Sequence, residues 1–249
     1  CDAVKFQKRT IDLVYTAEVL DASRESPWGN TQRDQKQGLE FTLEQYQEID
    51  RYCRDKGILW SASAWDIPSL EFLEGFNPPF HKIASAMLTH GPFVEAVAAK
   101  GRLTLVSTGM ATIEIIDEVV GIFKSAGTPF VLLHTVSTYP SRESDLNLSM
   151  IHTLLERYKV PVGYSGHEPS VSPSIVAAVL GATVIERHIT IDRSMYGSDQ
   201  AASLEANGLR QLVTTLRKMP EMLGTGEKDW APGEKAVAEK LRYWETPSG

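Results

Sequence analysis

Short apolar segments alternate with amphipathic segments along most of this chain, and this alternation constrains its fold more than any other feature. Seven short segments have the length and composition of buried strands: residues 2–7, 58–63, 80–85, 103–109, 130–136, 160–167 and 183–188. Between or after them, helices are predicted over residues 43–56, 68–76, 92–100, 113–125, 148–158 and 204–222, and another ends near residue 180. Strands that alternate with helices in this way form βα units around a parallel sheet.

A closed parallel barrel needs eight strands, whereas seven are predicted and the chain opens directly in the first. We therefore expect an α/β fold of the TIM (β/α)₈ barrel type that lacks its first βα unit in this chain. An open doubly wound sheet is the alternative, but no glycine-rich dinucleotide fingerprint follows the first strand. We expect the barrel domain over residues 1–225 and a tail or linker over 226–249. Residues 8–38 are expected to form a long functional loop, such as a cover over the site.

The composition excludes several classes of protein. The net charge of −7 and the pI near 5.4 argue against nucleic-acid binding. No apolar run approaches the ~20 residues that a membrane span needs. The two cysteines, Cys1 and Cys53, show no pairing pattern, which indicates a reducing compartment. We expect a cytoplasmic enzyme that binds neither nucleic acid nor membrane.

Two consecutive predicted strands each deliver a histidine at the carboxyl end, His167 and His188. Parallel strands joined by a helix place both imidazoles on the same rim of the sheet. Two neutral imidazoles facing one cavity suit a divalent first-row metal that keeps open positions for substrate. For a lone histidine, a hydrogen-bonded rim residue is the more common interpretation. Their pairing on neighbouring strands favours the metal.

The other strand ends carry cations and hydroxyls. In order along the chain these residues are Lys5, Gln7, Ser63, Lys82, Ser85, Ser107, Thr108, Ser137, Tyr139 and Ser165. A single serine at a strand end is most often a turn residue. Small hydroxyls that recur on successive strands, together with two lysines that need a negative partner, fit better with a ring of donors around an anion. A small phosphorylated carboxylic acid would satisfy such a ring.

These motifs, in this order over almost the whole chain, resemble the sialic acid synthase family. The matching segments are 5–7, 82–85, 107–110, 137–140, 163–167, 186–190 and 197–199. The resemblance implies a TIM barrel that condenses phosphoenolpyruvate with an N-acetylated mannose-type sugar. The sequence leaves open whether this sugar is N-acetylmannosamine, its 6-phosphate or a bacillosamine-type relative. The products would be phosphate and N-acetylneuraminate or its 9-phosphate.

The resemblance also implies roles for individual residues. It places Mn²⁺ or Mg²⁺ on His167 and His188, and the sugar near Gln7, Tyr139, Asp199 and Asn30. It assigns catalytic roles to Lys82, Tyr139 and Asp199. The residues that would hold phosphoenolpyruvate are Lys5, Ser63, Lys82, Ser85, Ser107, Ser137 and Ser165.

The chain departs from the family pattern at several points. A first strand that carries a glutamate near the sugar is not in this sequence. Met87 stands where many members have an acidic residue, and Ser137 stands where some have asparagine. Many members continue into a small antifreeze-like domain that lends an arginine to the partner's active site, and from this we expect a homodimer.

Two other functions remain open from the sequence alone. A Schiff-base pyruvate aldolase on the same barrel would use Lys82 or Lys5 as its nucleophile. A non-catalytic sugar- or metal-binding barrel would use the same pocket without turnover.

Overall fold

The computed structural model describes residues 1–245, and the chain divides into two compact units, residues 1–213 and 214–249. The first unit is built on a parallel sheet of seven strands in the order β1-β4-β5-β6-β7-β8-β9. The strands are β1 (Ala3–Lys8), β4 (Leu59–Ala64), β5 (His81–Ile83), β6 (Thr104–Ser107), β7 (Phe130–Thr135), β8 (Val162–Gly166) and β9 (Ile185–Arg187). All seven predicted strands are therefore present.

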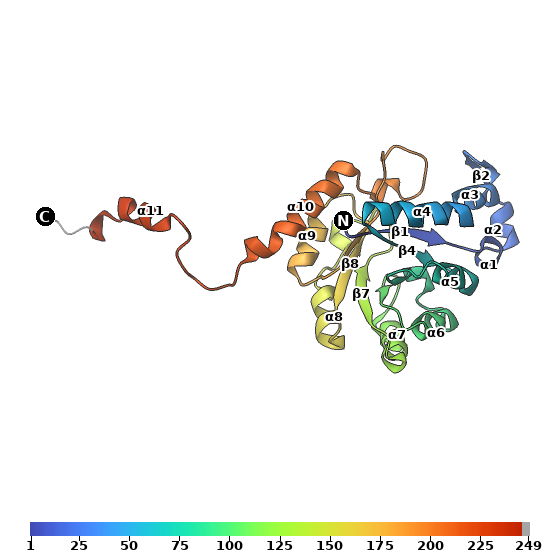
Figure 1. The fold of residues 1–249 in the computed structure, drawn as a ribbon, viewed down its shortest axis with the longest axis horizontal. Helices are drawn as coiled ribbons and strands as arrows, with labels where there is room; N and C mark the ends of the chain where they lie inside the picture. The colour runs from blue at the N-terminus through green and yellow to red at the C-terminus, as the bar shows by residue number, and fades with distance from the viewer. Residues whose placement is uncertain (246–249) are drawn as a thin grey trace. The chain divides into compact units, whose positions relative to one another are not determined.

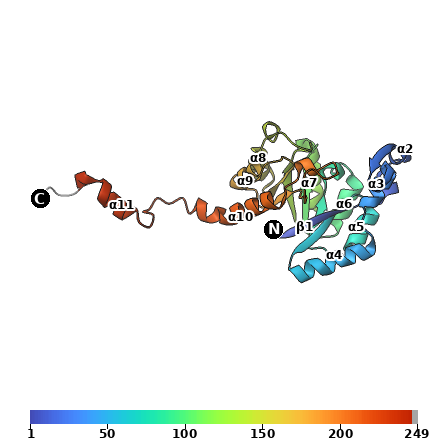
Figure 2. The same ribbon diagram turned by 90° about the horizontal axis from the view of Figure 1, so that it is seen from above.

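Helices cover the outer face of this sheet (Figures 1 and 2). They are α4 (Leu43–Lys56), α5 (Ile67–Glu74), α6 (Gly91–Ala99), α7 (Ile113–Ala126), α8 (Met150–Tyr158) and α9 (Ser172–Val179). α4 begins at a capping box formed by Thr42 and Gln45, and it ends at Gly57, whose φ of +65° favours glycine. Three short 3₁₀ helices lie in the loops, at Ser85–Met87, Glu143–Asp145 and Gln200–Ala202.

The sheet curls far enough to bring its first and last strands together. Lys5 on β1 and Glu186 on β9 form an ion pair of 3.0 Å, although neither strand pairs with the other in the sheet. Strand order, parallel pairing and outer helices confirm the predicted barrel-type α/β fold. The carboxyl ends of the strands consequently face one cavity.

Aromatic side chains pack α4 against β4 and α5 on the outer side of the first strands. Tyr46 of α4 is fully buried and packs against Trp60 of β4 and Phe72 of α5, with ring centroids 5.8 and 5.3 Å away. Its hydroxyl donates to the carbonyl of Gln7 at 2.9 Å. Because Gln7 is a predicted site residue, this packing positions one wall of the cavity.

The prediction of a long loop over residues 8–38 is wrong in one respect, because the segment contains helices and a hairpin. It contains α1 (Ile11–Val14), α2 (Ala17–Asp21), a hairpin of β2 (Ser23–Ser26) and β3 (Gly29–Thr31), and α3 (Gln32–Leu39). Side-chain caps stabilise these short elements, since Thr16 caps α2 and Thr31 forms a capping box with Asp34. The segment has too few apolar residues for a hydrophobic periodicity to indicate these helices and strands from the sequence.

α10 (Ala206–Leu223) agrees with the last predicted helix, over residues 204–222. The second unit further holds α11 (Glu234–Leu241) and a 3₁₀ helix, Tyr243–Glu245. The expected tail over residues 226–249 stays a prediction, and its last four residues lie outside the described ones. Within the described residues, no helix is long and apolar enough to cross a membrane.

Candidate active site

A cavity of about 330 Å³ lies at the carboxyl ends of the strands. The structure brings twelve predicted site residues together in its lining: Lys5, Gln7, Ser63, Lys82, Ser85, Ser107, Ser137, Tyr139, Ser165, His167, His188 and Asp199. Asn30 is not among the lining residues; it is exposed on β3, where its backbone N–H donates to Asp34. Its predicted contact with the sugar stays a prediction.

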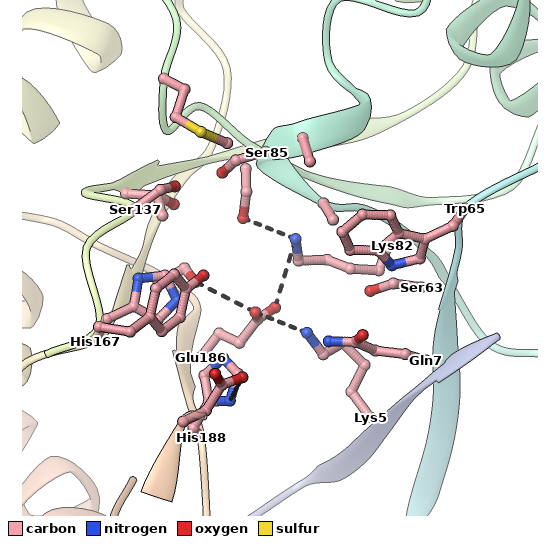
Figure 3. A pocket seen from close by; sticks show the side chains of 18 of the residues that line it. Lys5, Gln7, Ser63, Trp65, Lys82, Ser85, Ser137, His167, Glu186 and His188 are labelled. Atoms are coloured by element: carbon pink, nitrogen blue, oxygen red, sulfur yellow. Dashed lines mark hydrogen bonds and ion pairs between the residues drawn. The ribbon is translucent and has the colours of Figure 1, made fainter. Parts of the chain in front are cut away.

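Glu186 lies between the two lysines, and no role was predicted for it from the sequence. Its carboxylate is 3.0 Å from Lys5 Nζ and 3.9 Å from Lys82 Nζ. Dashed lines mark both ion pairs in Figure 3. Ser165 Oγ donates to the same carboxylate at 3.2 Å. Burial alone would raise the pKa of Glu186, but the two ammonium groups outweigh it and lower the pKa to about 2. The chain thus supplies one carboxylate for two ammonium groups, which leaves a net positive charge on this side of the cavity.

A sequence signal for Glu186 existed. Residues two apart on a strand point to the same face, so Glu186 shares the inner face of the sheet with His188. Arg187, between them, points outward and pairs with the fully buried Glu168 at 3.0 Å. These two outward residues adjoin the two site histidines in the chain, so their ion pair ties together the ends of β8 and β9.

Lys82 is the most deeply buried cation of the site, with its side chain 2% exposed. Its Nζ donates to Ser107 Oγ at 2.7 Å and to the carbonyl of Ile83 at 2.8 Å. Burial lowers the pKa of Lys82 to about 8, although the carboxylate of Glu186 acts in the opposite direction. The site thus keeps an ammonium group that is held in place and that titrates close to neutral pH.

Hydroxyl groups line the side of the cavity next to Lys82. Among the described residues, the buried Oγ atoms of Ser63 and Ser137 have no hydrogen-bond partner. Ser85 Oγ accepts from the backbone N–H of Gly109 at 3.0 Å. A Cβ atom at Gly109 would come too close to the hydroxyls of Ser137 and Ser85, so a larger residue there would displace them. Buried hydroxyls without partners are unfavourable unless a ligand satisfies them, which supports a polar ligand on this side.

The two histidines lie across the cavity on neighbouring strand ends. The ring centroids of His167 and His188 are 5.2 Å apart, and that of Tyr139 is 4.1 Å from His167. His167 Nδ1 donates to the carbonyl of Val136 at 2.7 Å, which leaves Nε2 with its lone pair. Burial lowers the pKa of both imidazoles, that of His188 to about 4, where Lys5 and His167 add to the effect. Both rings are therefore neutral at pH 7.

Two neutral imidazoles with one fixed tautomer have the chemistry of metal ligands. The described residues contain no group of three or more histidine, cysteine or acidic side chains arranged to hold a metal ion. Asp199 comes within 3.8 Å of His188 Nδ1. The residues present thus fit a divalent cation held by two protein ligands and completed by water or substrate.

The fold and the site together define a barrel enzyme whose cavity has lysines and serine hydroxyls on one side and imidazoles on the other. Residues 1–228 match the model of the NeuB family, and the chain belongs to this family. Its relatives carry the names of sialic acid-type synthases, so the predicted family and the predicted enzyme are confirmed.

Individual relatives match over nearly the whole chain. The N-acetylneuraminate-9-phosphate synthase of Homo sapiens is 38% identical over 96% of this chain and 68% of its own length. The N,N'-diacetyllegionaminic acid synthase of Legionella pneumophila is 30% identical over 97% of this chain and 70% of its own. The chain thus spans little more than two thirds of these relatives.

Solved structures confirm the barrel. The sialic acid synthetase of Leptospira borgpetersenii, in complex with citrate, superposes with a TM-score of 0.82 at 31% identity, covering 97% of this chain and 82% of that one. A truncated 3-deoxy-D-arabino-heptulosonate 7-phosphate synthase of Thermotoga maritima superposes with a TM-score of 0.65 over 75% of this chain and 74% of that one. At 16% identity, the second structure shows the fold alone.

Proposed function

We propose that the protein condenses phosphoenolpyruvate with N-acetylmannosamine, or with its 6-phosphate, to give phosphate and N-acetylneuraminate or its 9-phosphate. One observation carries this proposal: a single cavity has two lysines on one side and two neutral imidazoles on the other. On the lysine side, the hydroxyls of Ser63 and Ser137 have no hydrogen-bond partner among the described residues. The first side suits a small phosphorylated acid, and the second suits the polarised oxygen of an aldehyde. The names of the relatives support the sugar-acid product.

Phosphoenolpyruvate is proposed to bind between the lysines and the hydroxyls. The ammonium groups of Lys5 and Lys82 supply the positive charge for its phosphate and carboxylate. Ser63 and Ser137 supply hydroxyl donors that have no partner among the described residues. Donors fixed in this way stabilise developing negative charge without reorganising during the reaction.

The sugar is proposed to react in its open-chain form on the imidazole side. Bound by His167 and His188, Mn²⁺ or Mg²⁺ would supply Lewis-acid polarisation of the aldehyde oxygen. Partial burial raises the pKa of Tyr139 to about 12, so its hydroxyl stays protonated and can donate a hydrogen bond to the sugar. Asp199, on the same wall, orients the sugar hydroxyls. Holding both substrates in one cavity lowers the barrier by up to about 7–11 kcal/mol.

The proposed reaction forms one carbon–carbon bond and breaks the C2–O bond to phosphate. C3 of phosphoenolpyruvate attacks the aldehyde carbon, the aldehyde oxygen takes a proton and becomes a hydroxyl, and a cationic centre forms at C2. Water adds at C2 and releases its proton, and the C2–O bond to phosphate then breaks. Loss of phosphate makes the condensation effectively irreversible.

The test is phosphate release from phosphoenolpyruvate with a panel of N-acetylated sugars, with Mn²⁺ and with EDTA. We expect release that depends on sugar and metal, and that is lost in His167→Ala but kept in His152→Ala, since His152 is exposed on α8. Phosphate release that does not depend on the sugar, or full activity of His167→Ala, contradicts the proposal. The expected homodimer is checked by analytical ultracentrifugation of the same preparation.

A Schiff-base aldolase is the second candidate, because the pKa of Lys82, near 8, is what an amine nucleophile needs. Reaction with pyruvate and borohydride distinguishes the two functions. A covalent adduct on Lys82, together with activity that resists EDTA, would favour the aldolase.

A further inference from the structure

Arg9 places a third cation at the cavity, in addition to Lys5 and Lys82. It follows β1 directly and lines the cavity, with its guanidinium carbon 4.6 Å from the centroid of the Trp65 ring. It donates to the side-chain oxygen of Gln7. Its buried Nε has no hydrogen-bond partner among the described residues. A guanidinium that is held by stacking and has a buried N–H without a partner can donate a hydrogen bond to an acceptor group of a ligand.

Two further cations lie on the folded segment after β1, Arg24 on β2 and Lys36 on α3. Arg24 Nε donates to the hydroxyl of Tyr196 at 3.3 Å, and Gln35 Nε2 donates to the same hydroxyl at 3.1 Å. That hydroxyl in turn donates to the carbonyl of Glu25 at 3.1 Å. Tyr196 lies three residues before Asp199, which lines the cavity. The cation-bearing segment is therefore fastened to a wall of the site.

Lys36 lies within electrostatic range of both arginines. Burial lowers the pKa of Lys36, repulsion from Arg9 and Arg24 lowers it further, and Asp199 acts in the opposite direction. Its Nζ is 5.2 Å from the centroid of the Tyr15 ring. The cations Arg9, Arg24 and Lys36, which we name the outer cation cluster, thus gather beside the wall that carries Asp199.

The outer cation cluster is short of carboxylates. Glu40 approaches Arg9 at 3.9 Å but is shared with Lys8 at 3.3 Å. Over residues 1–245, no carboxylate lies within ion-pair distance of Arg24 or Lys36. By contrast, Arg33 on the same helix as Lys36 is paired with Asp12 and Asp21. A chain with a net charge of −7 keeps an unbalanced positive group here, and such a group attracts an anion.

We propose that the outer cation cluster binds a phosphate group on the acceptor sugar, so that the substrate is a 6-phosphorylated N-acetylhexosamine. This inference rests on the proposed function. The aldehyde carbon, C1, reacts near the histidines, whereas the 6-phosphate is at the opposite end of the open chain and needs its own anion site. Because the three carbons of phosphoenolpyruvate add before C1, C6 of the sugar becomes C9, and the product is a 9-phosphate.

The test compares N-acetylmannosamine with its 6-phosphate as acceptor for the intact protein and for Lys36→Met and Arg24→Gln. We expect the wild type to prefer the phosphorylated sugar, and each substitution to lower kcat/KM for that sugar about 10- to 100-fold, the usual effect of removing a charged hydrogen-bond donor. The change should fall on KM, with kcat and the rate on the unphosphorylated sugar within about twofold.

Arg33→Met is the matched control, because it removes a cation from the same helix whose charge is already neutralised. It should leave the preference for the phosphorylated sugar unchanged. A wild type that prefers the unphosphorylated sugar, or a Lys36→Met variant that loses activity equally on both sugars, overturns the inference.

The inference and the proposed function fail in different ways. If no sugar stimulates phosphate release, the proposed function fails, and calorimetric titration with N-acetylmannosamine 6-phosphate then decides the inference alone. Binding that weakens in Lys36→Met but not in Arg33→Met supports the phosphate site. Absence of binding to the wild type, or equal binding to all variants, rejects it.

Discussion

Replacing Lys82 by methionine keeps the volume of the side chain but removes the buried ammonium group. In the folded protein the pKa of Lys82 is about 8, against an ordinary value of 10.5 that applies to the unfolded chain. Between these pH values the unfolded chain binds one proton more than the folded one. The free energy of unfolding therefore rises with pH in this window, because the folded protein no longer has to hold a buried charge.

The size of the effect follows from the two pKa values. Each pH unit inside the window adds about 1.4 kcal/mol, so from pH 7.5 to pH 10 the wild type gains about 2 kcal/mol from Lys82 alone. Lys82→Met lacks this group and lacks this gain. Titrating groups that do not interact with Lys82 act in both proteins and cancel in the difference between them.

Urea unfolding of both proteins at pH 7.5 and pH 10 measures this difference. Lys56→Met is the control, because it removes an exposed cation at the end of α4 and should follow the wild type at both pH values. If Lys82→Met and the wild type respond to pH in parallel, Lys82 is not a strained buried cation and the reasoning is refuted. If the reasoning holds, the site keeps its ammonium group at a cost in stability.

The remaining predictions concern the neighbours of Lys82 and of the histidines. Glu186→Gln removes the carboxylate that raises the pKa of Lys82, so kcat/KM for phosphoenolpyruvate at pH 8 should fall at least about tenfold and recover toward pH 6; an unchanged pH profile would argue against it. His167→Ala should abolish the binding of Mn²⁺, measured by electron paramagnetic resonance, while circular dichroism shows the fold intact; tight binding in the variant would remove His167 from the metal site. Glu168→Gln breaks a buried ion pair with Arg187 and should lower the free energy of unfolding by about 3–5 kcal/mol, and a loss below about 1 kcal/mol in urea unfolding would show that the pair contributes little.

The main elements of the barrel were predictable because they depend on local patterns. Each strand is a short apolar run, each covering helix has its own periodicity, and parallel strands place their carboxyl ends together. This is why the positions of His167, His188 and Lys82 followed from the sequence. The folded segment after β1 was missed because its helices are short and polar and depend on caps such as Thr31.

The role of Glu186 could not be predicted from the sequence for a different reason. Its meaning depends on the curl of the sheet, which brings β9 against β1 and so places a carboxylate between two lysines. No local sequence pattern predicts this contact between β1 and β9, although the alternation with His188 indicates that Glu186 lies on the inner face of the sheet. The proposed cluster of Arg9, Arg24 and Lys36 was not predicted either, because these residues are far apart in the sequence and come near one another only when residues 8–38 fold.

The ion pair between Lys5 and Glu186 joins residues 181 positions apart in the chain. Contacts of such long sequence separation form late in folding, since the intervening chain must be ordered before they add stability. Ligand affinity should therefore develop after the helical signal during refolding, as the final event of barrel assembly. A partly folded chain would hold normal helices and still be unable to retain an anion, so recovery of ligand binding is the stricter criterion of native structure.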